Sequence, residues 1–333
     1  MLITFKRLFV AVVLLFVGVA LGFLVSNYTK HPVAVNSSNL QEIRLKEGYK
    51  FINPLLECDS NIQNSLQIRD LEARLKDYIN TKISNNNITF AAIYFRDLNN
   101  GPWLSINSST RFSPASLLKV PLMIGYYKWS ESDPSVLNKK LNDDVTDVQA
   151  SYKNVEFIPQ KELQAGSDYT IDDLISRMIM YSDNVSTEVL TRNISDAKKF
   201  QTFVDMDVDT SMLLSNPTGD TISVKDYASF FRILYNASYL NGTLSEKALQ
   251  LLSKSTFMQG IVAGVPKDTV VAHKFGERFH EDTGEKQLHD CGIVYAPKHP
   301  YLLCVMTKGN DYDLLSKSIA EISTIVYSKV TSE

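Results

Sequence analysis

The residues whose types and spacing could do chemistry are Ser116 and Lys119, in the order Ser-x-x-Lys within the apolar stretch 112–124. On a helix, side chains three positions apart share one face, with Cβ atoms roughly 5–6 Å apart, so the lysine can reach the serine hydroxyl. A lysine that is buried among apolar side chains loses hydration, which lowers its pKa and lets the amine act as a base. Because a serine hydroxyl becomes a nucleophile when a base takes its proton, the pair predicts nucleophilic catalysis.

The Ser-x-x-Lys pattern is weak by itself, since a chain of 333 residues holds about one match by chance. A second match, residues 195–198, lies in a polar stretch with no apolar helix behind it, and we interpret it as chance. Pro114 suits the first turn of a helix, and the apolar residues around Ser116 predict that this helix is buried. Pro121 lacks an N–H and predicts a kink one turn beyond the serine. The case for Ser116 therefore depends on partners elsewhere in the chain.

Two further short patterns carry groups that could serve the same site. The run Ser182-Asp183-Asn184 offers a hydroxyl that can relay a proton and an amide that can donate and accept. All three residue types also favour turns, so the run could simply close a helix. The run Lys274-Phe275-Gly276 lies on a predicted strand, where a cation can hold a carboxylate and a glycine lets a substrate backbone come close.

The periodicity of the sequence predicts the elements that must position these residues. Apolar residues at helical spacing predict helices at residues 65–83, 170–181, 186–192, 196–204, 224–235, 245–252 and 313–330. Runs of β-branched and aromatic residues predict strands at residues 88–96, 103–106, 270–275, 287–295 and 301–308. Thr170 is the expected N-cap of its helix, and residues 133–169 should form loops and short helices. Strands at both ends with helices between them predict one antiparallel sheet built from both termini, with a cleft at the seam.

The order, spacing and context of the three patterns resemble the penicillin-recognising serine hydrolases, and most of all the class A β-lactamases. The resemblance covers residue 68 to the C-terminus and implies an α/β (α+β) fold, a five-stranded antiparallel sheet flanked by helices plus an all-helical subdomain. We expect a serine hydrolase domain over residues 63–333, with the helical subdomain at about residues 116–255.

The resemblance also implies a role for each site residue. Ser116 would be the nucleophile, Lys119 its proton acceptor, and Ser182 the group that passes a proton to the leaving nitrogen. The substrate would be held by Asn184 at its amide, by Lys274 at its carboxylate, by the open strand edge at Gly276, and by an oxyanion hole made of the N–H groups of Ser116 and Glu277.

Two departures from the family pattern concern turnover. Phe275 stands where the family has a hydroxyl residue, which removes one hydrogen bond to substrate and could shape the site for a more apolar ligand. Class A β-lactamases use a loop glutamate to activate the deacylating water, but residues 189–245 contain no glutamate. The corresponding loop, residues 213–221, is short, and its one acid, Asp220, is better suited to closing the loop than to catalysis. Acylation machinery is therefore predicted to be complete and deacylation machinery incomplete.

Three interpretations of function follow from this. The leading one is a membrane-anchored class A β-lactamase-like hydrolase, acylated at Ser116 by a β-lactam or by a peptidoglycan stem peptide ending in D-Ala-D-Ala. A D,D-peptidase or transpeptidase of the cell wall is the alternative within the same chemistry. A non-catalytic module that binds peptidoglycan or β-lactams is the alternative from another class.

Composition limits the partners and cofactors. The net charge is −3 and the chain has no basic block beyond residues 6–7, so we expect no nucleic-acid partner. The five histidines show no ligand spacing, and Cys58, Cys291 and Cys304 are too scattered for a zinc site, so we expect no metal and no cofactor. Cys291 and Cys304 fall on one predicted strand pair, but paired neighbours rarely have ideal disulfide geometry. We therefore expect free thiols.

The N-terminal segment predicts a membrane anchor. Residues 8–25 form an uncharged apolar run just long enough to cross a bilayer, and the basic residues 6–7 before it place the N-terminus in the cytoplasm. A cleaved signal peptide is the competing interpretation. We expect a single-pass protein of the cell membrane, with the lipid bilayer as a partner of residues 1–25 and the catalytic domain outside the cytoplasm. Residues 26–62 should be a tether whose last part, residues 49–58, lies extended on the domain.

Overall fold

The computed structural model of the chain describes residues 43–44, 48–57, 66–99, 101–142, 150–158, 163, 166–216 and 218–332. The predicted membrane segment and most of the predicted tether lie outside these residues. None of the helices within the described ranges is long and apolar enough to span a bilayer.

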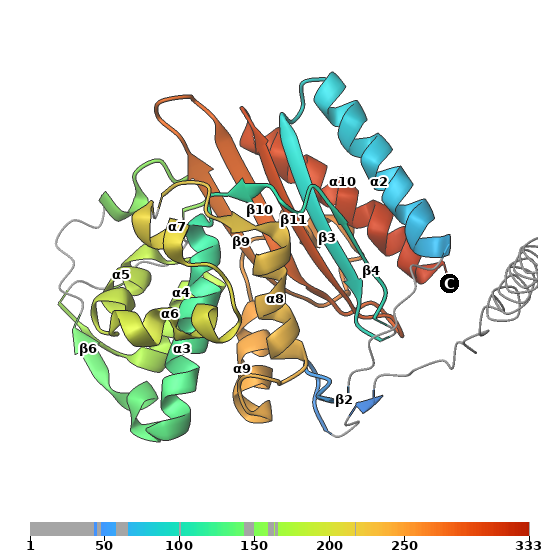
Figure 1. Cartoon of the computed structure of the whole chain (residues 1–333). Helices are drawn as coiled ribbons and strands as arrows, with labels where there is room; N and C mark the ends of the chain where they lie inside the picture. The colour runs from blue at the N-terminus through green and yellow to red at the C-terminus, as the bar shows by residue number, and fades with distance from the viewer. Residues whose placement is uncertain are drawn as a thin grey trace, which may run out of the picture. The chain divides into compact units, whose positions relative to one another are not determined.

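Five antiparallel strands form the central sheet in the order β4-β3-β11-β10-β9 (Figure 1). Their bounds are Phe90–Asp97 for β3, Trp103–Ile106 for β4, Val271–Phe279 for β9, Lys286–Val294 for β10 and Tyr301–Gly309 for β11. The pairing of β3 with β11 joins the two ends of the domain. The predicted five-stranded sheet built from both termini is therefore confirmed, and each strand lies within a few residues of its predicted position.

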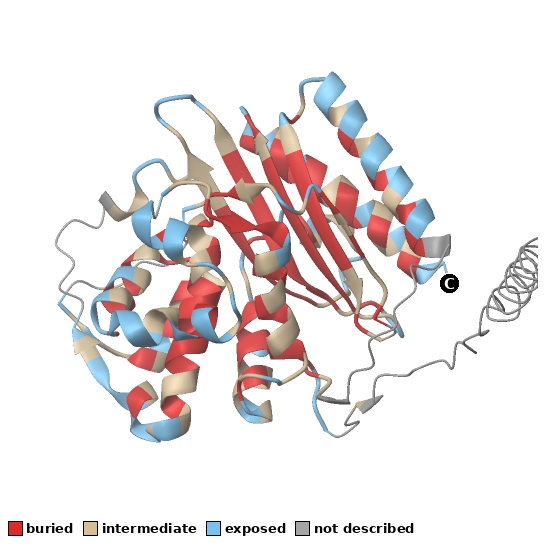
Figure 2. Cartoon of the chain, in the orientation of Figure 1, coloured by how far each residue is buried: buried red, intermediate tan, exposed pale blue. Residues whose placement is uncertain are grey.

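Helices cover both faces of this sheet (Figure 1). On one face, α10 (Tyr312–Thr331) packs on β10 and β11, and α2 (Leu66–Ser84) lies beside it. On the other face, α8 (Val224–Tyr235) packs on β11. The remaining helices are α3 Lys119–Ser132, α4 Ile171–Met180, α5 Asn184–Arg192, α6 Asp196–Asp205, α7 Ser211–Ser215 and α9 Gly242–Leu252. Apolar side chains project from both faces of the strands and pack against the helices, so the sheet is buried on both sides (Figure 2).

Short elements connect these helices and strands. Two-stranded pairs form between β1 (Ile43–Arg44) and β2 (Leu55–Glu57), between β5 (Arg111–Phe112) and β8 (Ile222–Ser223), and between β6 (Lys140–Asn142) and β7 (Asp168–Thr170). The 3-10 turns are η1 Ala115–Leu118, η2 Pro134–Asn138, η3 Ala150–Tyr152 and η4 Val262–Gly264. The β6–β7 pair lies in a stretch predicted as loops, because strands of three residues are too short to show a period of two.

The segment before the domain lies against it, as predicted, with bends at residues 50 and 51 before the strand β2. The carboxylate of Glu246 accepts the backbone N–H groups of Lys50, Phe51 and Ile52, each at 2.9 Å. The ring of Phe51 packs edge-on against Tyr295, with ring centroids 5.4 Å apart. One half-buried carboxylate and one aromatic contact thus fix residues 50–52 to the domain.

The prediction of free thiols is wrong for the two cysteines on the strand pair. Cys291 and Cys304 lie directly opposite each other in the β10–β11 register and form a disulfide. Directly opposed residues of an antiparallel pair point to the same face of the sheet, which brings the two sulfur atoms together within the buried core. Cys58 lies outside the described residues.

Candidate active site

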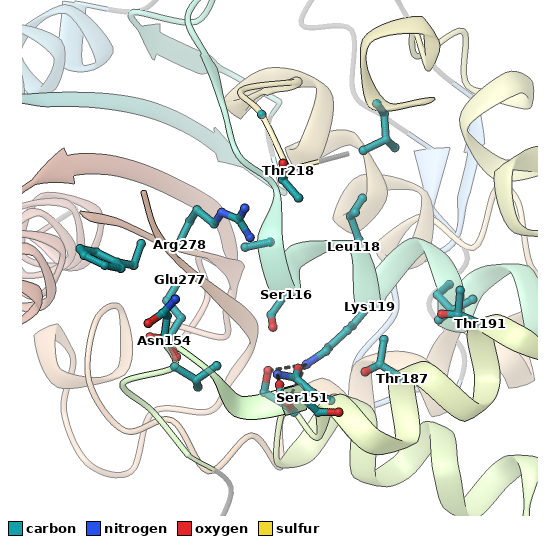
Figure 3. Close-up of a pocket in the computed structure, with 18 of the residues that line it drawn as sticks. Ser116, Leu118, Lys119, Ser151, Asn154, Thr187, Thr191, Thr218, Glu277 and Arg278 are labelled. Atoms are coloured by element: carbon teal, nitrogen blue, oxygen red, sulfur yellow. Dashed lines mark hydrogen bonds between the residues drawn. The ribbon is translucent and has the colours of Figure 1, made fainter. Parts of the chain in front are cut away.

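Ser116 lies on η1, directly before α3, and its side chain points into the same cavity as Lys119 (Figure 3). The predicted kink at Pro121 is wrong, because Pro121 falls in the first turn of α3, where an N–H has no helical partner, and α3 runs unbroken to Ser132. The backbone oxygen of Leu117 accepts the hydroxyl of Tyr227 at 3.0 Å. The turn that carries Ser116 is thus fixed from α8.

The backbone next to Ser116 is held in a rarely populated conformation. Ala115, directly before Ser116, has a positive φ of 46°, and Ser182 has a φ of 56°. For residues other than glycine such angles persist only where the surrounding structure enforces them. One of them directly precedes Ser116 and the other falls on Ser182, so both border the site.

Lys119 is buried beneath this turn and meets the second pattern. Its Nζ donates to the backbone oxygen of Ser182 at 2.6 Å, to Ser182 Oγ at 3.1 Å and to Asn184 Oδ1 at 2.6 Å. Burial lowers the pKa of Lys119 to about 7, against the opposing charges of Asp183 and Glu277. A large fraction of Lys119 is therefore a neutral amine near pH 7, which is the form that accepts a proton.

In the run Ser182-Asp183-Asn184, the middle residue caps a helix and the two outer residues contact Lys119. Asp183 is the N-cap of α5, since its Oδ1 accepts the N–H of Val185 at 2.9 Å and its Oδ2 accepts the Ser186 hydroxyl at 2.7 Å. The flanking Ser182 and Asn184 are thereby held against Lys119. Asn184 donates one Nδ2 hydrogen to the backbone oxygen of Ser151 at 2.7 Å, while its Oδ1 accepts from Lys119.

Lys274 is buried beside Ser182. It does not line the cavity, and its Nζ donates to Ser182 Oγ and to the backbone oxygen of Phe275, both at 2.9 Å. Burial, together with the nearby charge of Lys119, lowers the pKa of Lys274. These contacts bring the third sequence pattern to the second one.

Gly276 is required by a close contact within the protein. A Cβ at this position would lie 2.9 Å from Leu117 Cγ and 3.1 Å from the backbone oxygen of Pro114. The glycine thus allows strand β9 to approach the turn that carries Ser116. The next residue, Glu277, lines the cavity together with Ser116.

The two departures from the family pattern also have structural explanations. Phe275 is buried on the far side of β9, where it stacks on Phe257 with ring centroids 4.1 Å apart, so it does not make the cavity more apolar. Asp220 pairs with Lys308 and accepts Gln287 Nε2 at 2.9 Å. These contacts lower the pKa of Asp220 against the opposing effect of burial. Asp220 therefore closes its loop, which is the non-catalytic role expected of it.

The cavity in front of Ser116 has a volume of about 1170 Å³, and part of its wall was not foreseen. Residues Ser151, Lys153, Asn154, Val155 and Phe157 line it, from a stretch with no periodic pattern. Arg278 also lines it, and its Nε is buried without a hydrogen-bond partner among the described residues. Alternation along β9 places Lys274, Gly276 and Arg278 on one face, so the strand prediction could have found this arginine had it extended beyond Phe275. No group of His, Cys, Asp and Glu side chains in the described ranges could hold a metal ion.

Comparisons with known proteins agree with this geometry. The sequence model of the Beta-lactamase enzyme family matches residues 71–330, so the chain belongs to that family of penicillin-recognising serine hydrolases. The β-lactamase VEB-1 of Pseudomonas aeruginosa is 22% identical over 243 residues, which cover 67% of this chain and 80% of that protein. The β-lactamase Toho-1 of Escherichia coli is 26% identical over 207 residues, with coverages of 59% and 67%.

Solved structures show the same fold. PBP-A superposes with a TM-score of 0.65 at 21% sequence identity, covering 79% of this chain and 97% of that chain. The TLA-1 extended-spectrum β-lactamase superposes with a TM-score of 0.64 at 16% identity, covering 77% and 98%. A mutant of PBP-A has been captured as an acyl-enzyme complex with penicillin G.

Proposed function

We propose that the protein is a serine acyl hydrolase that β-lactams or D-Ala-D-Ala-type peptides acylate at Ser116. In this reaction Lys119 takes the hydroxyl proton while Ser116 Oγ attacks the carbonyl carbon. The carbon–nitrogen bond of the substrate then breaks, and Ser182 passes a proton to the leaving nitrogen. The observation that carries the proposal is geometric: Ser116 and Lys119 line one cavity, and the buried Nζ of Lys119 contacts Ser182 and Asn184.

In this proposal, the carboxylate of the substrate binds the guanidinium of Arg278. This guanidinium lies on the face of β9 that approaches the nucleophile turn, and it lines the cavity, which Lys274 does not. Arginine binds a carboxylate through two parallel hydrogen bonds and stays charged at any working pH. The contact positions the bond to be cleaved relative to Ser116.

Hydrolysis of the acyl-enzyme should be slow. The loop residues that line the cavity are Leu213, Leu214, Asn216, Thr218 and Gly219, and no side chain among them can take a proton from water. Four other carboxylates line the cavity. Asp196 pairs with Lys199, Glu281 pairs with Lys153, and Glu277 accepts two backbone N–H groups, whereas Asp282 is exposed to solvent. Loss of a positioned base lowers a rate by roughly 10²–10⁴-fold. This arrangement also favours the transpeptidase form of the cell-wall alternative, in which an amine replaces water as the acyl acceptor.

Two measurements test the proposal. Intact-mass spectrometry after incubation with several β-lactams should show one adduct on the wild-type protein and none on Ser116→Ala. A chromogenic cephalosporin should then give a stoichiometric burst followed by little turnover. Absence of any adduct together with absence of hydrolysis refutes acylation, whereas steady hydrolysis without a burst refutes slow deacylation alone.

We also propose a location. Residues 8–25 would span the cell membrane once, and the domain that follows them would lie outside the cytoplasm. The Cys291–Cys304 disulfide supports an oxidising compartment, where such bonds persist. Protease added to intact spheroplasts should digest the domain while a cytoplasmic marker survives. Protection of the domain until the cells are lysed would refute the location.

A further inference from the structure

Residues 150–158 form part of the cavity wall, and we call them the strap. The strap is attached on both sides of the cleft, to the helices on one side and to the sheet on the other. At the helical bank, Tyr152 donates its hydroxyl to Asp183 at 2.8 Å, and the backbone oxygen of Ser151 accepts from Asn184. At the bank formed by the sheet, Asn154 Nδ2 donates to Glu281 at 2.6 Å. The strap thus runs from the residues that hold Lys119 to the strand beside Ser116.

The attachment to β9 depends on the side chain of Glu277. Its two carboxylate oxygens accept the backbone N–H groups of Glu156, at 2.8 Å, and Phe157, at 3.0 Å. Hydrogen bonds to a charged acceptor are stronger than those between neutral groups, and a carboxylate that faces two adjacent N–H groups satisfies both. The proposed acylation uses the backbone N–H of Glu277, and the side chain acts on it through its charge, which raises the pKa of Lys119.

An aromatic cluster supports the same attachment. The ring of Phe157 packs edge-on against Phe257 at 5.0 Å and against Phe275 at 5.7 Å between ring centroids. Phe275 stands where the family has a hydroxyl residue, so this departure gives Phe157 of the strap an aromatic ring on β9 to pack against. A small hydroxyl residue at position 275 would remove that contact.

We propose that the strap limits the size of the acyl donor that reaches Ser116, and that Glu277 and Phe275 are the positioning residues that hold it. The inference rests on the proposed acylation of Ser116. Because Ser151, Lys153, Asn154, Val155 and Phe157 all line the cavity, release of the strap from β9 widens the cleft. The contacts at the helical bank, and with them the Lys119 cluster, stay in place.

The test combines a structural readout with a kinetic one. Glu277→Gln keeps the shape of the side chain but leaves one acceptor oxygen for two N–H groups, and Phe157→Leu removes the ring. In both variants, hydrogen exchange at the amides of residues 156 and 157 should become roughly tenfold faster. Acylation is followed by intact mass with 6-aminopenicillanic acid, which has no acyl side chain, and with nafcillin, whose side chain is bulky. The ratio of the nafcillin rate to the rate with the small probe should rise roughly tenfold in both variants.

Glu285→Gln is the matched control, since it makes the same substitution in the β9–β10 hairpin without touching the strap. It should change neither readout. Unchanged exchange in Glu277→Gln and Phe157→Leu refutes the attachment, and faster exchange with an unchanged ratio of rates refutes the limit on size. If no variant and no probe gives an adduct, the proposed acylation fails, and the role in selecting acyl donors fails with it.

Discussion

The pH dependence of acylation should report the ionisation of Lys119, whose pKa is lowered by burial to about 7. The base must be neutral, so acylation should rise with pH through this value. With that pKa, about one tenth of Lys119 is neutral at pH 6 and about nine tenths at pH 8, which predicts a nearly tenfold increase in the acylation rate. Stopped-flow acylation by a chromogenic cephalosporin measures this rate directly.

The variant Asp183→Asn shows which lysine the pH profile reports. Lys274, the neighbour of Lys119, is the other candidate, since the pKa of Lys274 is also lowered by burial. The charge of Asp183 raises the pKa of Lys119 but is not among the charges that act on Lys274. Its removal should move the rise in rate to lower pH, while the asparagine oxygen can still cap α5 through Val185. An unchanged profile would assign the titration to another group.

Lys119→Arg tests the same reasoning by substitution. A guanidinium stays protonated throughout this range and cannot act as base, so acylation should fall by roughly 10²–10⁴-fold and lose its rise with pH. Lys128→Arg, on the same helix and paired with the partly exposed Glu131, is the matched control and should behave as wild type. Acylation independent of pH between 6 and 8, or acylation preserved in Lys119→Arg, would refute Lys119 as the base.

Three further predictions follow from the geometry. Gly276→Ala should push β9 away from the nucleophile turn, lower the free energy of unfolding by about 1–3 kcal/mol in urea denaturation and slow acylation, and wild-type behaviour would contradict the close contact. Arg278→Gln should slow acylation by β-lactams roughly tenfold but leave the rate for their methyl esters unchanged, with partial rescue by Arg278→Lys, and equal effects on acid and ester would exclude a carboxylate contact. Thiol titration of the denatured, unreduced protein should find one free thiol, because Cys291 and Cys304 are bridged, whereas three would show that the bridge is absent.

Local sequence patterns could predict most elements because apolar periodicity is a local property. Val224–Tyr235 was predicted as a helix with the bounds that the structure gives it, and Thr170 caps α4 by accepting the N–H of Asp173. Caps and apolar faces depend on residues within one or two turns, so they are visible without tertiary contacts. The β6–β7 pair was missed because its pairing joins two distant stretches of three residues.

The sequence by itself also determined the chemistry offered to the site, because residue type and order along the chain identify Ser116, Lys119 and the run that begins at Ser182. Only the tertiary structure decided what each residue touches. Burial placed Lys274 behind Ser182 and left Arg278 at the cavity, although both lie on one face of β9. Such choices depend on packing between segments more than 90 residues apart, as in the bond from Lys274 to Ser182. A local sequence pattern does not contain these long-range contacts, because they depend on how the whole core packs.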